Sequence, residues 1–502
     1  MAALSKPNII LGPPGTGKTT TLMNIVESLL EKGVKPDEIG FISFTKKATT
    51  EARDKARARF GFSVEQMPFF RTIHSLAFRQ LGLSRQQVMQ HSHYQELCDE
   101  LGVEITGRQT GEDGTLVGMA QGDKLRFVEG MARIRCVPLK QQWEDLNDDD
   151  LGWFELEQFG KSLKEYKDNQ GLIDYTDMLE LMRSEGFVPK LKALLVDEAQ
   201  DLSKLQWMVV ERMMEKADET YIAGDDDQAI FRWAGADIDH FISLAGNVRV
   251  LDQSYRIPAV VHDLSFEIIK SVTRRREKTF KPAAHRGSIT YHNDIEHVDM
   301  SQGTWLLLAR NVYMLKELVD LCHREGYAYE CQGMSPRKSE ALLAIRSWEK
   351  LRKGEFIQAD QLKLVYSHMS KRMVDHGHLS LKTLTEDMVN MDLLHAKYGL
   401  QTKAIWHQAL DRISDEEKEY FLAALRQGES LSGDPRIIIS TIHGSKGGEA
   451  DNVLLITDLS PKTYDGYQEN QDDELRVFYV AATRTKKNLH IITPRTQRYF
   501  DL

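Results

Sequence analysis

The amino-acid sequence predicts an α/β protein with two parallel-sheet domains, each interrupted by a mainly helical insertion. Short apolar runs rich in Ile, Val and Leu alternate with helical stretches along most of the chain. This alternation is typical of parallel strands that are joined by helical crossovers and buried on both faces. Two long stretches without such runs, residues 83–170 and 335–433, interrupt the series and are predicted to be the helical insertions.

The apolar runs divide into two groups, one for each predicted domain. The first domain is expected to comprise residues 1–82 and 171–256, with strands at residues 8–11, 39–44, 194–196, 221–223 and 248–251. The second is expected to comprise residues 257–334 and 434–502, with strands at residues 288–291, 305–309, 327–331, 437–440, 453–457 and 489–493. The helical insertion of each domain lies between its two segments.

Composition narrows the class of protein. With 41% hydrophobic and 28% charged residues, the chain resembles ordinary globular proteins and not disordered or fibrous ones. The four cysteines form no CxxC pair, which argues against a disulfide framework or a zinc site. Apolar runs are too short for a membrane span, and the first residues turn polar too soon for a signal peptide. We expect a soluble, cytoplasmic protein that has no contact with a membrane.

The charge distribution leaves two interpretations open. The formal net charge of −10 argues against non-specific coating of polyanions. Lysines and arginines nevertheless gather in residues 46–59, which contain only two acidic residues. This run is either a basic track for nucleic acid or a solvated helix face.

Residues 12–19, GPPGTGKT, fit the phosphate-binding pattern GxxxxGK[ST]. The segment follows an expected strand and precedes a helical run, which is the context that the pattern requires. Its glycines let backbone N–H groups approach phosphate oxygens at the start of a helix. Lys18 is expected to reach the outer phosphates and Thr19 to bind Mg²⁺. The predicted nucleotide-binding residues are Gly12, Pro13, Gly15, Thr16, Gly17, Lys18, Thr19 and Thr20.

Two carboxylates follow the strand predicted at residues 194–196. Ligands of open parallel sheets bind at the carboxyl ends of the strands, where Asp197 and Glu198 lie. Asp197 is the candidate for holding Mg²⁺, and Glu198 for orienting and deprotonating the attacking water. Two ordinary surface acids are the alternative, which the preceding phosphate loop disfavours.

Residues 224–237 combine an acidic turn with alternating aromatic and cationic side chains. Gln228 ends the turn and is placed to sense a terminal phosphate. Phe231 and Trp233 flank Arg232, an arrangement that suits stacking on unpaired bases. Ordinary core packing of the two aromatic side chains is the alternative.

Six segments, in this order, resemble motifs of the UvrD/Rep/PcrA helicases of superfamily 1. They are GPPGTGKT at 12–19, DEAQD at 197–201, GDDDQ-IFRW within 224–233, QSYR at 253–256, STIHGSKGGE at 440–449 and VAATR at 480–484. FTKKA at 44–48, TIHS at 72–75 and IDYTDML at 173–179 resemble further motifs of that family. The resemblance covers both predicted sheet domains and says little about the two insertions.

This resemblance implies two RecA-like domains, with ATP and Mg²⁺ bound in the cleft between them. Lys18, Asp197, Glu198 and Gln228 would act on phosphate, metal and water, and Arg256 and Arg484 would be arginine fingers. Tyr255 would stack on the adenine and Glu449 would hold the ribose. The nucleic-acid track would be lined by Phe44, Thr45, His74, Phe231, Trp233, Thr441 and His443. The implied function is an ATP-dependent helicase moving 3′ to 5′ on single-stranded and tailed duplex DNA.

Departures from the family pattern keep alternatives open. The glutamine that reads adenine in the family has no counterpart before Gly12, so we expect a looser preference for ATP. The short second insertion also suits a single-strand translocase that displaces proteins and unwinds weakly. A nucleic-acid-binding module switched by ATP is a further alternative, disfavoured by Glu198 and the two arginines. RNA also remains open as a substrate.

Overall fold

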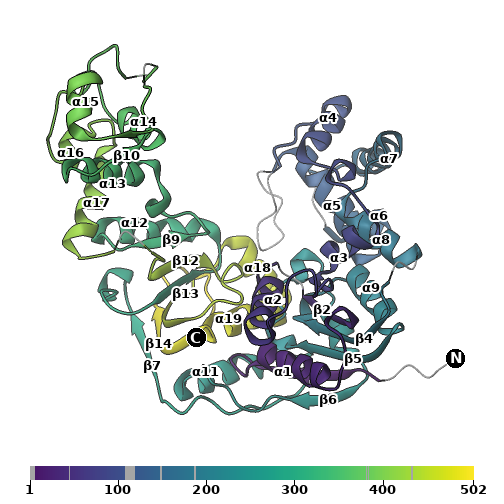
Figure 1. The fold of residues 1–502 in the computed structure, drawn as a ribbon. Helices are drawn as coiled ribbons and strands as arrows, with labels where there is room; N and C mark the ends of the chain where they lie inside the picture. The colour runs from purple at the N-terminus through teal and green to yellow at the C-terminus, as the bar shows by residue number, and fades with distance from the viewer. Residues whose placement is uncertain are drawn as a thin grey trace.

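The computed structural model describes residues 6–43, 46–107, 119–146, 150–185, 188–379, 381–382, 384–430 and 433–502. Within these residues the chain forms two six-stranded sheets, whose strands are all parallel. Figure 1 shows the two sheets next to each other, with helices packed around them. The prediction of an α/β fold with two RecA-like parallel sheets is therefore confirmed.

The first sheet has the strand order β3-β2-β4-β5-β1-β6. Its strands are β1 (Asn8–Leu11), β2 (Ile39–Ser43), β3 (Phe70–Thr72), β4 (Leu191–Asp197), β5 (Ala217–Gly224) and β6 (Asn247–Val250). Its helices are α1 (Lys18–Glu31), α2 (Lys46–Phe60), α3 (Ile73–Gln80), α8 (Tyr175–Glu185), α9 (Lys204–Met214) and α10 (Ile238–Ser243). Helices α1 and α2 pack on one face, and α3, α8 and α9 on the other. This explains why both faces of the central strands are apolar.

Strand order brings the sequence motifs of the first sheet together. Strand β5 lies between β4 and β1, and all three run in the same direction. Their carboxyl ends therefore meet at one edge of the sheet, where ligands of parallel sheets bind. The phosphate loop follows β1, Asp197 ends β4, and the turn that contains Gln228 follows β5.

The second sheet has the strand order β7-β14-β13-β8-β12-β9. Its strands are β7 (Ser288–His292), β8 (Trp305–Ala309), β9 (Tyr329–Cys331), β12 (Ile437–Thr441), β13 (Ala450–Ile456) and β14 (Thr485–Ile492). Its helices are α11 (Ala259–Ile269), α12 (Leu315–Glu325), α18 (Pro461–Glu469) and α19 (Gln471–Ala482). Helices α11 and α19 pack on one face and α12 on the other.

Both insertions are mainly helical, as predicted. The first contains α4 (His91–Leu101), α5 (Gln121–Arg135), α6 (Leu139–Leu146) and α7 (Trp153–Gln170). The second contains α13 (Glu340–Arg352), β10 (Ile357–Gln358), α14 (Ala359–Ser367), β11 (Met388–Val389), α15 (Met391–Lys397), α16 (Trp406–Ala409) and α17 (Asp415–Arg426). The small antiparallel pair β10–β11 was not predicted. Division of the chain at the residue boundaries given above stays a prediction.

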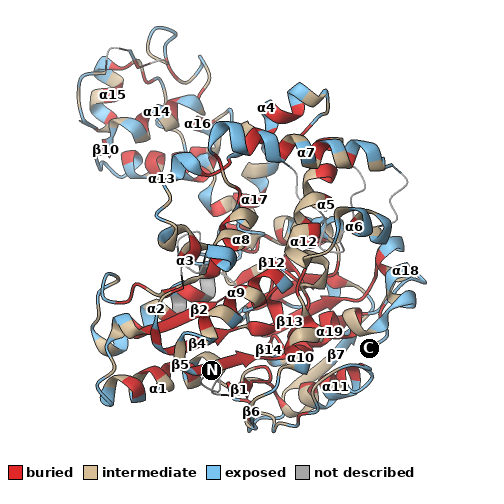
Figure 2. Ribbon diagram, turned by 90° about the vertical axis from the view of Figure 1, so that its right-hand side faces the viewer, coloured by how far each residue is buried: buried red, intermediate tan, exposed pale blue. Residues whose placement is uncertain are grey.

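The two insertions differ in how they are stabilised. The first has a hydrophobic core of its own, built around Phe159 and Leu156, whereas the core of the second, with Trp348 and Tyr366, continues into one face of the second sheet. Figure 2 shows buried residues concentrated in the sheets and exposed residues on the outer sides of the insertion helices. Among the described helices, none is long and apolar enough to span a membrane.

Candidate functional site

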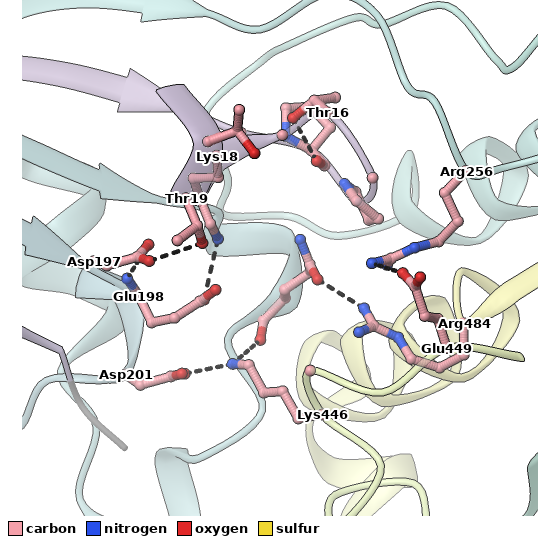
Figure 3. Close-up of a pocket in the computed structure, with 18 of the residues that line it drawn as sticks. Thr16, Lys18, Thr19, Asp197, Glu198, Asp201, Arg256, Lys446, Glu449 and Arg484 are labelled. Carbon is pink, nitrogen blue, oxygen red and sulfur yellow. Dashed lines mark hydrogen bonds and ion pairs between the residues drawn. The ribbon is translucent and has the colours of Figure 1, made fainter. Parts of the chain in front are cut away.

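A cavity of about 690 Å³ lies between the two sheets, and residues from both sides line it. Figure 3 shows these side chains pointing toward one another from the phosphate loop, the carboxyl end of β4 and the segments around β12 and β14. The predicted nucleotide-site residues in the lining are Gly12, Pro13, Gly15, Thr16, Gly17, Lys18, Thr19, Thr20, Asp197, Glu198, Gln228, Arg256, Glu449 and Arg484. Phe231 and His443 line the same cavity.

The phosphate loop is held tightly at the start of α1. Gly15 has a φ of 72° and Gly17 a φ of 79°, which L side chains rarely adopt. A Cβ atom on Gly15 would also lie only 2.5 Å from the Arg256 Cβ. Helix α1 begins directly after this loop, so its free N–H groups and partial positive charge favour an anion here.

Lys18 and Thr19 pair with the two carboxylates at the end of β4. The Lys18 Nζ lies 3.0 Å from the Glu198 Oε2, and the Thr19 hydroxyl donates to the Asp197 Oδ2 at 3.0 Å. Glu198 has a φ of 54°, an unfavourable conformation for a non-glycine residue that turns the chain sharply after the strand. Such strain at the end of a central strand is typical of functional residues.

The environments of these carboxylates differ. Burial alone would raise the pKa of Glu198, but the charges of Lys18 and Lys446 outweigh it and hold that pKa well below the usual range. Burial, followed by the charge of Glu198, raises the pKa of Asp197. A cation beside Asp197 would relieve this cost. The hydroxyl of Thr19 and the carboxylate of Asp197 are hard oxygen ligands, so this pair fits Mg²⁺.

Two cations of the second sheet reach across the cavity. The Lys446 Nζ donates to the Asp201 Oδ1 at 2.7 Å and to the Gln228 carbonyl oxygen at 2.6 Å. The Arg484 Nη2 donates to the Gln228 Oε1 at 2.8 Å. Asp201 and Gln228 belong to the first sheet's side, so these hydrogen bonds join the two halves of the molecule.

Arg484 is buried, and its described hydrogen bonds go only to uncharged oxygens. Besides Gln228, it donates to the carbonyl oxygens of Val480 at 3.0 Å and Gly448 at 3.4 Å. Burial, and then the neighbouring charge of Arg256, lowers the pKa of Arg484 to about 9. A buried guanidinium that lacks an anionic partner favours binding of a phosphate at this position.

Arg256 and Glu449 form an ion pair in the same cavity, and Lys486 approaches Glu449 at 2.6 Å. Tyr255 lies beside them and is 78% exposed. It lines an adjoining open cavity of about 610 Å³, together with Glu449, His285 and Lys486. The ring of Tyr255 is therefore free to stack on a planar ligand.

Three aromatic rings from both halves of the molecule meet at the edge of the cavity. Phe231 and Trp233 lie 6.5 Å apart, and each lies 6.2 Å from the ring of His443. The ammonium of Lys446 lies 4.9 Å from the centre of the Phe231 ring. Within the described part of the chain, the buried indole N–H of Trp233 has no hydrogen-bond partner. We call these three residues the ring cluster.

The other predicted nucleic-acid residues are placed differently. His74 packs edge-on against the exposed Tyr175, and burial lowers the pKa of His74 to about 4, so this imidazole is neutral at pH 7. Thr441 is fully buried, and its hydroxyl accepts a hydrogen bond from the Gly444 N–H. Its side chain therefore has no surface for a ligand in this conformation. Phe44 and Thr45 lie outside the described residues.

Sequence reasoning missed Asp201 and Lys446 as members of the site. Both lie inside motifs that were identified, DEAQD and STIHGSKGGE, so a signal was present. Their pairing could not be predicted because they lie 245 residues apart and meet only through the arrangement of the two sheets.

Comparisons with known proteins agree with this arrangement. Residues 1–249 match the UvrD/REP helicase N-terminal domain, and residues 404–496 match the UvrD-like helicase C-terminal domain. DNA helicase II of Haemophilus influenzae is 24% identical over 316 residues, covering 56% of this chain and 40% of that protein. ATP-dependent DNA helicase PcrA of Bacillus subtilis is 25% identical over 301 residues, covering 54% and 38% respectively. The chain thus spans about two fifths of the length of these curated relatives.

A solved structure of arterivirus nonstructural protein 10, a helicase in complex with DNA, covers 98% of this chain and 62% of that chain at 10% identity. Its TM-score is 0.34, which is too low to establish a shared fold.

The phosphate loop, the carboxylate pair and the two parallel sheets define a P-loop nucleotide-binding protein with two RecA-like domains. Together with the two family matches, which span more than half of the chain, they place it more narrowly. The chain belongs to the UvrD/Rep/PcrA-like helicases of superfamily 1.

Proposed function

We propose that this protein is an ATP-dependent DNA helicase that moves along single-stranded DNA and couples ATP hydrolysis to duplex unwinding. One observation carries the proposal. One cavity brings the phosphate loop and two carboxylates of one sheet to the cations of the other, and the ring cluster borders it. Such a cavity can hydrolyse a nucleotide and change shape as it does so.

Hydrolysis would begin with an exchange of partners at Lys18. The ammonium, now bonded to Glu198, would move to the outer phosphates of ATP, which would free the carboxylate. Glu198 would then take a proton from the attacking water as the water oxygen bonds to the terminal phosphorus. The bond from that phosphorus to the bridging oxygen would break, giving ADP and phosphate. Mg²⁺, held at Thr19 and Asp197, would neutralise charge on the phosphate oxygens.

Two arginines from opposite sides of the cavity would stabilise the transition state. Arg256 and Arg484 would contact the terminal phosphate and neutralise its developing charge. Arg484 would exchange the neutral oxygen of Gln228 for a phosphate oxygen. Tyr255 would stack on the base, and Glu449 would hold the ribose. Because these residues belong to both sides of the cavity, ATP binding would draw the sheets together and product release would let them separate.

Movement on DNA would follow from the short connection between the nucleotide site and the ring cluster. Gln228, which lines the cavity, and Trp233, which belongs to the ring cluster, lie only five residues apart in the chain. Phe231 and Trp233 would stack on unpaired bases, and His443 would approach from the other side. Closure of the cavity would shift the two sets of rings relative to one another and move a base along. His74 would extend this track.

Strand displacement tests the proposal. A duplex with a 3′ or a 5′ single-stranded tail, as DNA or as RNA, is incubated with ATP and Mg²⁺. We expect unwinding of the DNA substrate with the 3′ tail, and no unwinding by the Glu198→Gln variant. Hydrolysis and protein displacement without strand separation would instead support the single-strand translocase that the short second insertion suggests. Binding without ATP turnover would support the switched module and overturn the helicase.

A further inference from the structure

A buried cluster of charges lies behind the turn that contains Gln228. The Lys278 Nζ lies 3.0 Å from the Asp225 Oδ1, 2.7 Å from the Asp226 Oδ1 and 2.9 Å from the Asp227 Oδ2. The side chains of all four residues are no more than 1% exposed. A buried ammonium with three carboxylates is costly to desolvate, which makes it a poor choice for stability alone and suggests a specific role.

Residues of the second sheet's side supply the cations of this cluster. Lys278 and Arg275 lie between α11 and β7, in the segment that leads into the second sheet. The Arg275 guanidinium donates to both oxygens of Asp227, at 2.8 and 2.5 Å. From α19, the Arg476 Nε donates to the Asp226 carbonyl oxygen at 2.9 Å. The turn that follows β5 of the first sheet is therefore held by the second half of the molecule.

One ion pair and two hydrogen bonds connect Lys278 to the nucleotide cavity. Lys278 contacts the Asp225 Oδ1 at 3.0 Å, and the other oxygen of Asp225 accepts from the Gln228 Nε2 at 2.7 Å. Because the amide nitrogen of Gln228 is engaged in this way, its oxygen faces the cavity and accepts from Arg484 at 2.8 Å. An amide has one donor end and one acceptor end, so the bond to Asp225 decides which end Arg484 meets.

We propose that Lys278 is a positioning residue for ATP hydrolysis, which acts through Asp225 to fix the amide orientation of Gln228. This inference rests on the proposed function, because it assigns Gln228 a part in ATP turnover. Without the ammonium, the three carboxylates would repel one another, and Asp225 would rotate away from Gln228. The amide of Gln228 would then be free to reverse and present its N–H₂ group to Arg484.

The test is a double-mutant cycle on DNA-stimulated ATP hydrolysis. In the wild-type background, we expect Lys278→Met to lower kcat by about tenfold or more, a size that is typical of residues coupled through one network of ion pairs and hydrogen bonds, with little change in the KM for ATP. In a Gln228→Ala background, we expect the same substitution to lower kcat by less than about twofold. Lys278→Arg, which keeps the charge, should recover part of the loss. Equal effects of Lys278→Met in both backgrounds would overturn the inference.

A matched control separates positioning from loss of stability. Lys167 is also buried, 9% exposed, and its ammonium lies 2.7 Å from carboxylate oxygens of Asp174 and Asp177, away from the cavity. Lys167→Met should lower the melting temperature but leave kcat per folded molecule unchanged. A loss of kcat as large as that of Lys278→Met would contradict the positioning role.

If Lys278→Met does not fold, Asp225→Asn replaces it in the cycle. Lys278 and Gln228 face different oxygens of Asp225, and an asparagine would present an N–H₂ group at one of these two positions. The same non-additivity with Gln228→Ala is therefore expected, and additivity overturns the inference. The wild type distinguishes the two levels of failure. Absence of DNA-stimulated hydrolysis in the wild type would overturn the proposed function, and this inference with it. Hydrolysis by the wild type with additive substitutions would overturn only the role of Lys278.

Discussion

The two sides of the nucleotide cavity are built in different ways. On the first sheet's side, Lys18 pairs with Glu198 and Thr19 with Asp197, so the polar groups are matched within one domain. On the second sheet's side, Lys446 and Arg484 reach across to oxygens of the first. One side is therefore assembled by its own fold, whereas the cations of the other are held by contacts that phosphate must replace.

Under the proposed function, this difference explains how nucleotide binding would be coupled to movement. A nucleotide that enters the cavity would compete with protein oxygens for the same cations, so bonds that it forms on the second side would replace bonds between the sheets. Closure would then be an exchange of partners that costs little, because the number of charge-assisted contacts would stay similar.

The largest effect is expected on the second side. Arg484→Ala removes the buried guanidinium that we propose contacts the terminal phosphate, and we expect kcat for ATP hydrolysis to fall by about 10³- to 10⁵-fold, as for other arginine fingers. Nucleotide binding, measured by fluorescence or calorimetry, should weaken far less. Lys487→Ala, three residues further along the chain on β14 and with an exposed side chain, is the control and should retain activity. Near-normal turnover of Arg484→Ala would show that the second side takes no part in the chemistry.

On the first side, Glu198→Gln and Lys18→Ala should fail for different reasons. Glu198→Gln leaves the water without a base, so we expect kcat to fall by about 10²- to 10⁴-fold while ATP still binds. Lys18→Ala removes a phosphate contact, so ATP binding itself should be lost. Binding and turnover are measured on both variants. If Glu198→Gln hydrolyses ATP at a rate near that of the wild type in the presence of DNA, the carboxylate has been assigned the wrong role.

Trp233→Ala tests whether the ring cluster acts on DNA. Stacking contributes roughly 1 to 3 kcal/mol per base, so we expect unwinding to fall by about 5- to 150-fold while ATP binding and maximal DNA-stimulated hydrolysis change little. Phe154→Ala, in the first insertion and 73% exposed, is the aromatic control. The competing explanation is core packing, which predicts a lower melting temperature with parallel loss of both activities.

Asp201, which accepts a hydrogen bond from Lys446 across the cavity, should make the stability of the fold depend on pH. Burial outweighs the charge of Lys446 and raises the pKa of Asp201 from 3.8 to about 6. Between pH 3.8 and pH 6, the Asp201 carboxyl group is ionised in the unfolded chain but protonated in the folded protein. It therefore stabilises the folded state below pH 4, and this contribution, on the order of 2 to 3 kcal/mol, is lost as the pH rises through 6. Asp201→Asn should therefore melt progressively higher, relative to the wild type, between pH 4 and pH 7.

Asp218 is the control for this pH experiment, because the opposite trend is expected for its substitution. Asp218 is exposed, and its hydrogen bond to Lys192 lowers its pKa, so Asp218→Asn should become less favourable, relative to the wild type, as the pH rises. The same trend for both variants would mean that Asp201 is not the source of the effect.

The sequence predicted the parts of the molecule that are specified locally. Strands β1 and β8 have the predicted bounds, because short apolar runs flanked by glycine or polar residues have little freedom to extend. Strand β3 was missed, since three residues that include Arg71 and Thr72 carry no apolar run, and the strand forms only by pairing with β2. Helical insertions were recognised by the absence of strand patterns.

The site was predictable to the extent that each motif carries its own chemistry. Lys18, Asp197 and Glu198 could be assigned because a phosphate loop and a strand end define them within a few residues. Lys278 carried no signal, because a single lysine in a polar stretch gains a role only from carboxylates about fifty residues earlier in the chain. Pairs across the cavity, such as Gln228 with Arg484, likewise depend on how two separate sheets are placed.

Under the proposed function, this cavity hydrolyses ATP at a rate that nucleic acid controls. Steady-state ATP hydrolysis by the full chain, measured with and without a single-stranded DNA oligonucleotide, tests it most directly. We expect the wild-type rate to rise strongly with DNA and to saturate, while Glu198→Gln stays at background under both conditions. A wild-type rate that is the same with and without DNA, or a Glu198→Gln variant that matches it, would contradict the claim.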